Sequence, residues 1–134
     1  MRLSLQDNLP FVSVSLKYNG SQVEIPHVLI DTGSGGTLFA ADDLAAIGIT
    51  PQDDDTLRHV HGVGGSEVVF VRRVEAVQVG NSQLADFEIE VGGMDYGFDI
   101  HGILGMDFLL AAGAHIDLEQ LNIEFKSLDS LQPG

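Results

Sequence analysis

The residues best suited to chemistry follow directly after a short apolar run. Val28–Ile30 leads into Asp31, Thr32, Gly33 and Ser34, and two further glycines come next. A carboxylate at the end of a buried strand is costly unless hydrogen bonds hold it, and the Ser34 hydroxyl and the backbone N–H groups around Gly33 are suited to supply them. A carboxylate held in this way can exchange protons with a substrate. The competing interpretation is an ordinary turn aspartate that bonds its own backbone.

A glycine-rich segment about thirty residues further on joins two strand-like runs. Its residues are His61, Gly62, Val63, Gly64 and Gly65. A plain hairpin needs only two residues with unusual backbone angles, so three glycines around one valine indicate a mobile tip. The sequence therefore predicts a hairpin whose end can move.

A third motif lies about seventy residues after the Asp-Thr-Gly triplet and precedes a short predicted helix. It consists of Ile103, Leu104 and Gly105. Two bulky apolar side chains and a glycine suit a segment that packs beneath a catalytic loop, because glycine lets two backbones approach closely. We therefore expect this segment to support the loop that carries Asp31.

Strands are predicted over most of the chain from the alternation of apolar and polar residues, and Asn19–Gly20 is a strong hairpin signal. The expected strands are Phe11–Tyr18, Ser21–Ile30, Thr37–Phe39, Thr56–Val60, Ser66–Val79, Gln83–Val91, Ala114–Leu118 and Asn122–Phe125. Short helices are expected at Asp43–Ile47, with Asp42 as N-cap, and at about Asp107–Ala112. These elements predict one all-β domain over residues 1–134, because a chain of this length commonly forms a single domain.

Charge and composition argue against several classes of function. Twenty acidic residues against six basic ones give a net charge of −14, whereas nucleic acids and anionic membranes bind basic surfaces. The pair Arg72–Arg73 is expected to be a solvated strand end. The absence of cysteine removes disulfides and thiol catalysis, and no metal or other cofactor is expected.

The expected location is the cytoplasm. No apolar run approaches the roughly 18 residues that a membrane-spanning helix needs, and no signal peptide is visible at the start of the sequence. A small domain without disulfides suits a reducing compartment. A periplasmic location, or a membrane anchor upstream of Met1, remains compatible with the sequence.

Taken together, the three motifs resemble those of the retropepsin-like aspartic proteases, and Ile103–Leu110 is most similar to the bacterial branch of that family. The resemblance covers about residues 10–126. It implies a single-domain, closed β-barrel with one or two short helices. It also implies that Asp31 is the catalytic carboxylate and that His61–Gly65 is a flap that closes over a bound peptide.

The same resemblance assigns roles to the rest of the loop. The Thr32 hydroxyl would brace the loop across a dimer, and Gly33 would let the backbone lie close to the catalytic pair. Ser34 would bond the outer oxygen of the Asp31 carboxylate. These roles are expectations that depend on the family pattern.

The chain carries one Asp-Thr-Gly loop, whereas pepsin-type enzymes carry two. The second aspartate would therefore come from another subunit, which predicts a homodimer. Two carboxylates about 3 Å apart cannot both ionise and share one proton, so the pair can act as a base toward water and as an acid toward the scissile carbonyl. The predicted function is hydrolysis of peptide bonds by two Asp31 residues at a dimer interface.

Some positions depart from the family pattern. Retroviral members pair a further loop aspartate with an arginine after the hydrophobic-hydrophobic-Gly element, and those places hold Gly35 or Gly36 and Met106 here. One support of a tight dimer is therefore missing. His101 stands where bacterial relatives commonly have aspartate, and a structural role is expected for it.

Two other functions remain open from the sequence. A monomer or inactive dimer of the same fold could bind an extended peptide by strand addition to a sheet edge. His59 and His61 alternate along a strand and so share a face, which makes a metal site conceivable, although no third ligand clusters with them.

Overall fold

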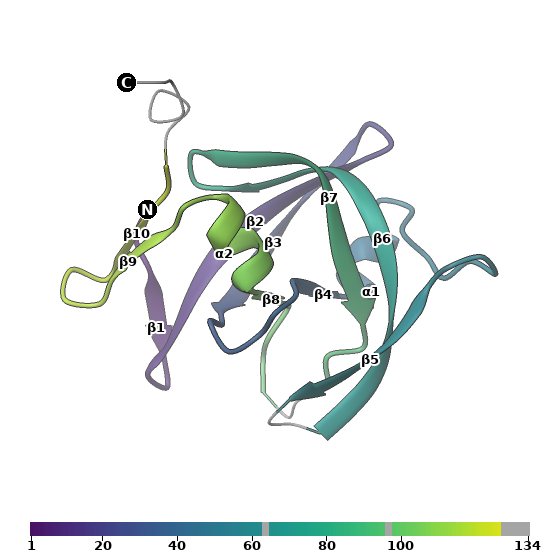
Figure 1. Cartoon of the computed structure of the whole chain (residues 1–134), viewed down its shortest axis with the longest axis horizontal. Coiled ribbons are helices and arrows are strands. Elements are labelled where there is room, and N and C mark those ends of the chain that lie inside the picture. The colour runs from purple at the N-terminus through teal and green to yellow at the C-terminus, as the bar shows by residue number, and fades with distance from the viewer. Residues whose placement is uncertain (63–64, 96–97, 127–134) are drawn as a thin grey trace.

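The structure is a computed structural model that describes residues 1–62, 65–95 and 98–126 (Figure 1). Within these residues the chain is mostly β-strand with two short helices, which confirms the predicted all-β class. The elements are β1 Ser4–Gln6, β2 Leu9–Tyr18, β3 Ser21–Ile30, β4 Leu38–Ala40, α1 Ala41–Ala45, β5 Leu57–Gly62, β6 Gly65–Val79, β7 Ser82–Gly92, β8 Gly102–Leu104, α2 Met106–Ala111, β9 His115–Asp117 and β10 Asn122–Glu124.

The strands close into a ring. The order β2–β3–β8–β4–β7–β6 returns to β2 because Leu16 of β2 pairs with Val77 of β6. β1 extends the ring beyond β2, and β5 extends it beyond β6. The β9–β10 hairpin stands apart from the ring, beside the N-terminal segment (Figure 1). This closed arrangement agrees with the fold that the sequence motifs imply.

The β2–β3 hairpin follows directly from its sequence. Its turn residues, Asn19 and Gly20, both have positive φ angles, 49° and 79°. A tight two-residue turn with positive φ at both positions matches the twist of the flanking strands. The turn brings Tyr18 opposite Ser21 and fixes the register that ends β3 at Ile30.

Apolar side chains fill the inside of the ring. Val14, Leu16, Phe39 and Phe108 are among those fully removed from water, and each such side chain contributes about 1.5–3 kcal/mol. The Phe108 ring of α2 meets the Phe87 ring edge-on, at a centroid distance of 5.7 Å. Helix α2 therefore seals the core directly behind the segment that contains Gly105.

Two element predictions need correction. The first helix begins at Ala41 rather than Asp43, and its N-cap is Ala40, which makes no side-chain capping bond. Asp42 lies in the first turn instead, where a negative charge favours the helix through its dipole. The strands β1 and β8 were not expected, and the sequence predicted Ile103–Leu104 of β8 only as a segment that packs beneath the loop.

Arg72 and Arg73 lie within β6 rather than at a strand end, and Arg72 is buried whereas Arg73 is solvated as predicted. The Arg72 Nη2 atom donates to both carboxylate oxygens of Asp55 at 2.9 Å and to the Thr50 carbonyl. Burial acts to raise the pKa of Asp55, but hydrogen bonds from the Gln52 backbone and from Arg72 hold that pKa below its ordinary value. The loop that contains Asp55 is thus held against β6.

The N-terminal segment is fastened to the C-terminal hairpin of the same chain. The Ile123 N–H donates to the Met1 carbonyl at 2.8 Å, and the Leu3 N–H donates to the Leu121 carbonyl at 2.9 Å. Both ends of the described chain therefore lie together (Figure 1). In the described parts of the chain, neither helix has the length and apolarity needed to cross a bilayer.

Candidate active site

Asp31 lies at the point where β3 leaves the ring. Its N–H donates to the Leu104 carbonyl at 3.0 Å, which continues the β3–β8 ladder by one bond. Its Oδ1 atom accepts a hydrogen bond from the Gly33 N–H at 2.9 Å, and the residue is partly exposed. A Cβ atom at residue 33 would lie only 3.2 Å from Oδ1. The Asp31 carboxylate is therefore held by a backbone hydrogen bond and remains partly exposed to solvent.

The Ser34 hydroxyl has a different partner from the one that the family pattern implies. It donates to the Gly36 carbonyl at 2.8 Å, and a hydroxyl has a single proton to donate. This bond closes the turn after Asp31 instead of bracing the carboxylate. Thr32 is exposed on the loop, and its bracing role across a dimer stays a prediction.

The Ile103–Gly105 segment lies between the two strands that flank the loop. Ile103 pairs with Leu29 of β3 on one side and with Leu38 of β4 on the other. A Cβ atom at Gly105 would lie 2.6 Å from the Gly36 carbonyl carbon and 2.9 Å from the Ser34 carbonyl oxygen. Only glycine allows this close approach, so the segment supports the loop by direct backbone contact.

A buried threonine ties the loop to α2, and the sequence analysis missed it. Thr37 is 1% exposed. Its hydroxyl donates to Asp107 Oδ1 at 2.7 Å and accepts from the Gly105 N–H at 3.1 Å. The same Asp107 oxygen accepts the Phe108 N–H at 2.7 Å. The sequence signal that could have indicated this contact was Asp107, which lies in the first turn of α2 just after the Ile103–Gly105 motif.

The predicted flap corresponds to the β5–β6 hairpin. His61 pairs with Ser66, and the backbones of Gly62 and Gly65 pair at its described end. His61 is exposed. Val63 and Gly64 lie outside the described residues. Figure 1 shows this long ribbon reaching away from the ring.

Comparison with known families identifies the family of the chain. A model described as aspartyl protease matches residues 14–108, which is more than half of the chain. The chain belongs to the aspartyl protease family. It is of the retropepsin-like type, as the motifs predicted. No curated protein matches its sequence.

This family member has a second apolar cluster on the loop side of the sheet. The cluster joins the strand that leads to Asp31, the central β8 strand and the two flap strands. Its buried members are Leu38, Val69, Met94 and Ile100, and Leu29, Ala40, Val60 and Ile103 pack against them. Leu29 immediately precedes Ile30 and Asp31, so the partly exposed members of the cluster, among them Leu29 and Ile103, lie beside the loop of this aspartyl protease family member.

The two flap-strand histidines share a face of β5 in this family member and are exposed. Within residues 1–62, 65–95 and 98–126, no three His, Asp or Glu side chains are grouped to hold a metal ion.

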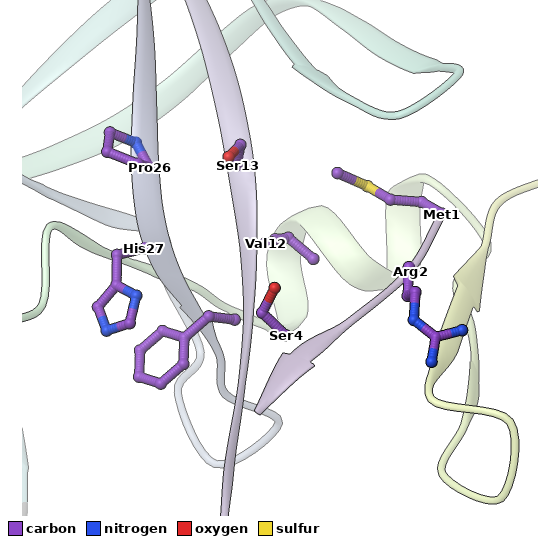
Figure 2. A pocket seen from close by; sticks show the side chains of 8 residues that line it. Met1, Arg2, Ser4, Val12, Ser13, Pro26 and His27 are labelled. Carbon is purple, nitrogen blue, oxygen red and sulfur yellow. The ribbon is translucent and has the colours of Figure 1, made fainter. Parts of the chain in front are cut away.

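A cavity of about 310 Å³ lies elsewhere, between the N-terminal segment and the β2–β3 hairpin (Figure 2). Its lining includes Arg2, Ser13 and His27. The His27 ring stacks on Phe11 at a centroid distance of 3.8 Å, and the residue has a φ of 59° at a bulge in β3. None of the predicted site residues lines this cavity.

His101 is held between two carboxylates. Its Nδ1 atom lies 2.8 Å from Asp43 Oδ2 and its Nε2 atom 3.0 Å from Asp99 Oδ1. Ionised carboxylates only accept, so both ring nitrogens must carry protons to satisfy both contacts. The hydrogen bond to Asp43 raises the pKa of His101, and burial partly opposes it. The predicted structural role therefore takes the form of a charged clasp between α1 and the segment before β8.

Replacing His101 with asparagine is expected to reduce stability at acidic pH and to matter less at alkaline pH. A pKa raised in the folded state means stability that is fully present below the unfolded value of about 6.5 and is lost as the pH rises through the folded value. The difference in Tm between wild type and His101→Asn should therefore shrink over that range. Thermal melts test this, with the exposed His115→Asn as control; a difference independent of pH would contradict it.

Proposed function

We propose that this chain is an aspartic endopeptidase whose catalytic site forms when two copies bring their Asp31 residues together. The observation that carries the proposal is the loop geometry: a partly exposed carboxylate, held at Oδ1 by the Gly33 N–H, on a loop packed against Gly105. Membership of the aspartyl protease family supports the same reaction. One such loop per chain supports the dimer.

The chemistry requires a proton shared by the pair. The ionised Asp31 removes a proton from a water molecule, which attacks the carbonyl carbon of the scissile peptide bond. The protonated Asp31 donates its proton to the carbonyl oxygen as that oxygen gains negative charge. Proton transfer to the amide nitrogen then releases the amine product.

The apolar cluster beside the loop supports a preference for bulky apolar side chains in the substrate. Leu29, Leu38 and Ile103 lie side by side on adjacent strands, and Val60 and Val69 bring the flap strands to the same cluster. An extended peptide between the loop and the flap would meet this surface. Burying apolar substrate atoms there contributes about 25 cal/mol per Å².

A second candidate function is peptide binding without cleavage. Among the described strands, β5 pairs with β6 alone and ends the sheet order. An edge strand offers free backbone groups to an added peptide strand. A binder has no need for a costly carboxylate on a supported loop, which is why we place this function second.

Specific activity is expected to rise with protein concentration, because only the dimer holds two aspartates. The net charge of −14 opposes association, and salt screens that repulsion over about 10 Å at 0.1 M, so salt should help. Cleavage of a mixed peptide library is measured between about pH 3 and pH 8 over about a hundredfold dilution, with sedimentation in parallel. Peptide binding without cleavage at any pH would favour the second candidate, and activity from a monomer would contradict the shared site.

A further inference from the structure

A largely buried carboxylate that the proposed chemistry does not use lies against the loop that carries Asp31. Glu90 of β7 pairs with Leu38 of β4, and its N–H donates to the Thr37 carbonyl at 2.8 Å. A Cβ atom at Gly36 would lie 2.7 Å from Glu90 Oε1 and 3.2 Å from Cδ. The Glu90 side chain is only 12% exposed. Its carboxylate therefore packs directly on the backbone of the loop that begins at Asp31.

The partner of this carboxylate comes from the flap. Arg58 lies on β5, four residues before the described end of that strand at Gly62. Its Nη1 atom is 3.4 Å from Glu90 Oε2, and its Nη2 atom is 3.0 Å from Glu88 Oε2. Hydrogen bonding to Glu88, with a further contribution from Glu90, raises the pKa of Arg58, so the guanidinium stays charged.

The contact matters because β5 has few other attachments. Among the described strands it pairs only with β6. The Arg58 side chain extends from this edge strand to Glu90 of β7, and Glu90 in turn contacts the loop at Gly36. This connection between β5 and the loop does not involve the flap tip. A change at Glu90 is therefore expected to affect two contacts, the packing on Gly36 of the loop and the ion pair with Arg58 at the base of the flap.

We propose that Glu90 and Arg58 form an electrostatic strut that sets the position of the flap strand relative to the catalytic loop. Glu90 is then a positioning residue for substrate binding, and this part of the inference rests on the proposed endopeptidase function. The strut itself depends only on the contacts within one chain.

The strut also responds to pH. Burial raises the pKa of Glu90, Arg58 on β5 opposes this, and Asp107 on α2 and Glu88 on β7 add to it. Because the folded pKa is raised, Glu90 takes up a proton earlier on acidification than an exposed glutamate does. Protonation removes the charge that holds Arg58, so the flap base should loosen as the pH falls through that value.

Glu90→Gln is the main test, since the amide keeps the size and loses the charge. At the highest pH at which wild type cleaves, KM should rise by about three- to fivefold, the effect expected of a lost ion pair, while kcat stays within about twofold. Arg58→Gln should have at least this effect, because it also removes the pair with Glu88, and the double variant should be no worse than Arg58→Gln alone. Arg58→Lys should restore part of the loss. The matched control is Arg73→Gln, which removes an exposed pair with Asp86 on β6 and β7.

Hydrogen exchange separates the strut from the protease assignment, because it needs no cleavage. Amides of residues 57–62 should exchange about three- to fivefold faster in Glu90→Gln and Arg58→Gln and at the wild-type rate in Arg73→Gln. As the pH is lowered, the protection of these amides from exchange in wild type should fall toward the level seen in Glu90→Gln. An inactive wild type with this exchange pattern would overturn the endopeptidase and keep the strut. Unchanged exchange in Glu90→Gln, or an equal change in Arg73→Gln, would overturn the strut.

Discussion

Asp31→Asn is expected to abolish peptide hydrolysis, with kcat/KM falling by about a thousandfold or more, while the fold stays intact. The asparagine oxygen can still accept the hydrogen bond that the Gly33 N–H makes to Asp31, so the loop keeps its shape. The amide cannot hold a negative charge or share a proton with its counterpart. Cleavage kinetics and thermal melts of purified protein measure both effects.

Asp42→Asn is the matched control for this variant. Asp42 is an exposed aspartate in α1, and its amide should leave cleavage unchanged. Cleavage by Asp31→Asn at the wild-type rate would show that another group carries the reaction. A loss of folding in Asp31→Asn would show instead that the carboxylate is needed for the loop itself.

Gly105→Ala is expected to damage both stability and activity. The new methyl group would meet the Gly36 carbonyl carbon and the Ser34 carbonyl oxygen at 2.6 and 2.9 Å. These are backbone atoms of the loop, so no side-chain rotation relieves the clash. Overpacking of this kind costs about 1–3 kcal/mol, and for a chain of this size Tm should fall by roughly 10 °C. Any dimer that still folds should cleave poorly, because the loop has been pushed away.

The control for this clash is Gly35→Ala, judged by stability alone. A Cβ atom at Gly35 meets nothing within 4 Å, so its Tm should stay near that of wild type. Equal losses of Tm in the two variants would indicate a general intolerance of the loop to side chains. A Gly105→Ala protein as stable as wild type would show that close packing at Gly105 is not needed to shape the loop.

The parts of the fold that the sequence predicted well are those set by neighbouring residues. Ser21–Ile30 is a strand with the predicted bounds, because alternation and the Asn19–Gly20 turn both act locally. The loop after Ile30 was also predictable, since Asp-Thr-Gly-Ser combines a turn former, glycine and short polar side chains. The order of three motifs was enough to indicate the family.

The parts that escaped prediction depend on contacts between distant segments. Nothing local in Thr37 shows that it meets Asp107 seventy residues later, and the burial of Arg72 depends on where the loop with Asp55 folds back. In the sequence, Glu90 looks like an ordinary acidic residue in a strand of alternating polar and apolar residues. Its place against Gly36 follows from the pairing of β4 with β7, which no short window of sequence contains.

The pairing of β3 with β8 has a consequence for the order in which the protein folds. The Asp31 N–H finds its partner in Leu104, and the loop takes its shape only when Gly105 closes against Gly36. A contact across so much of the chain forms slowly, because the intervening loop must first be closed. During synthesis the segment that contains Asp31 leaves the ribosome before Leu104 and Gly105 do. The loop that carries Asp31 therefore reaches its folded shape only after Gly105 has been made.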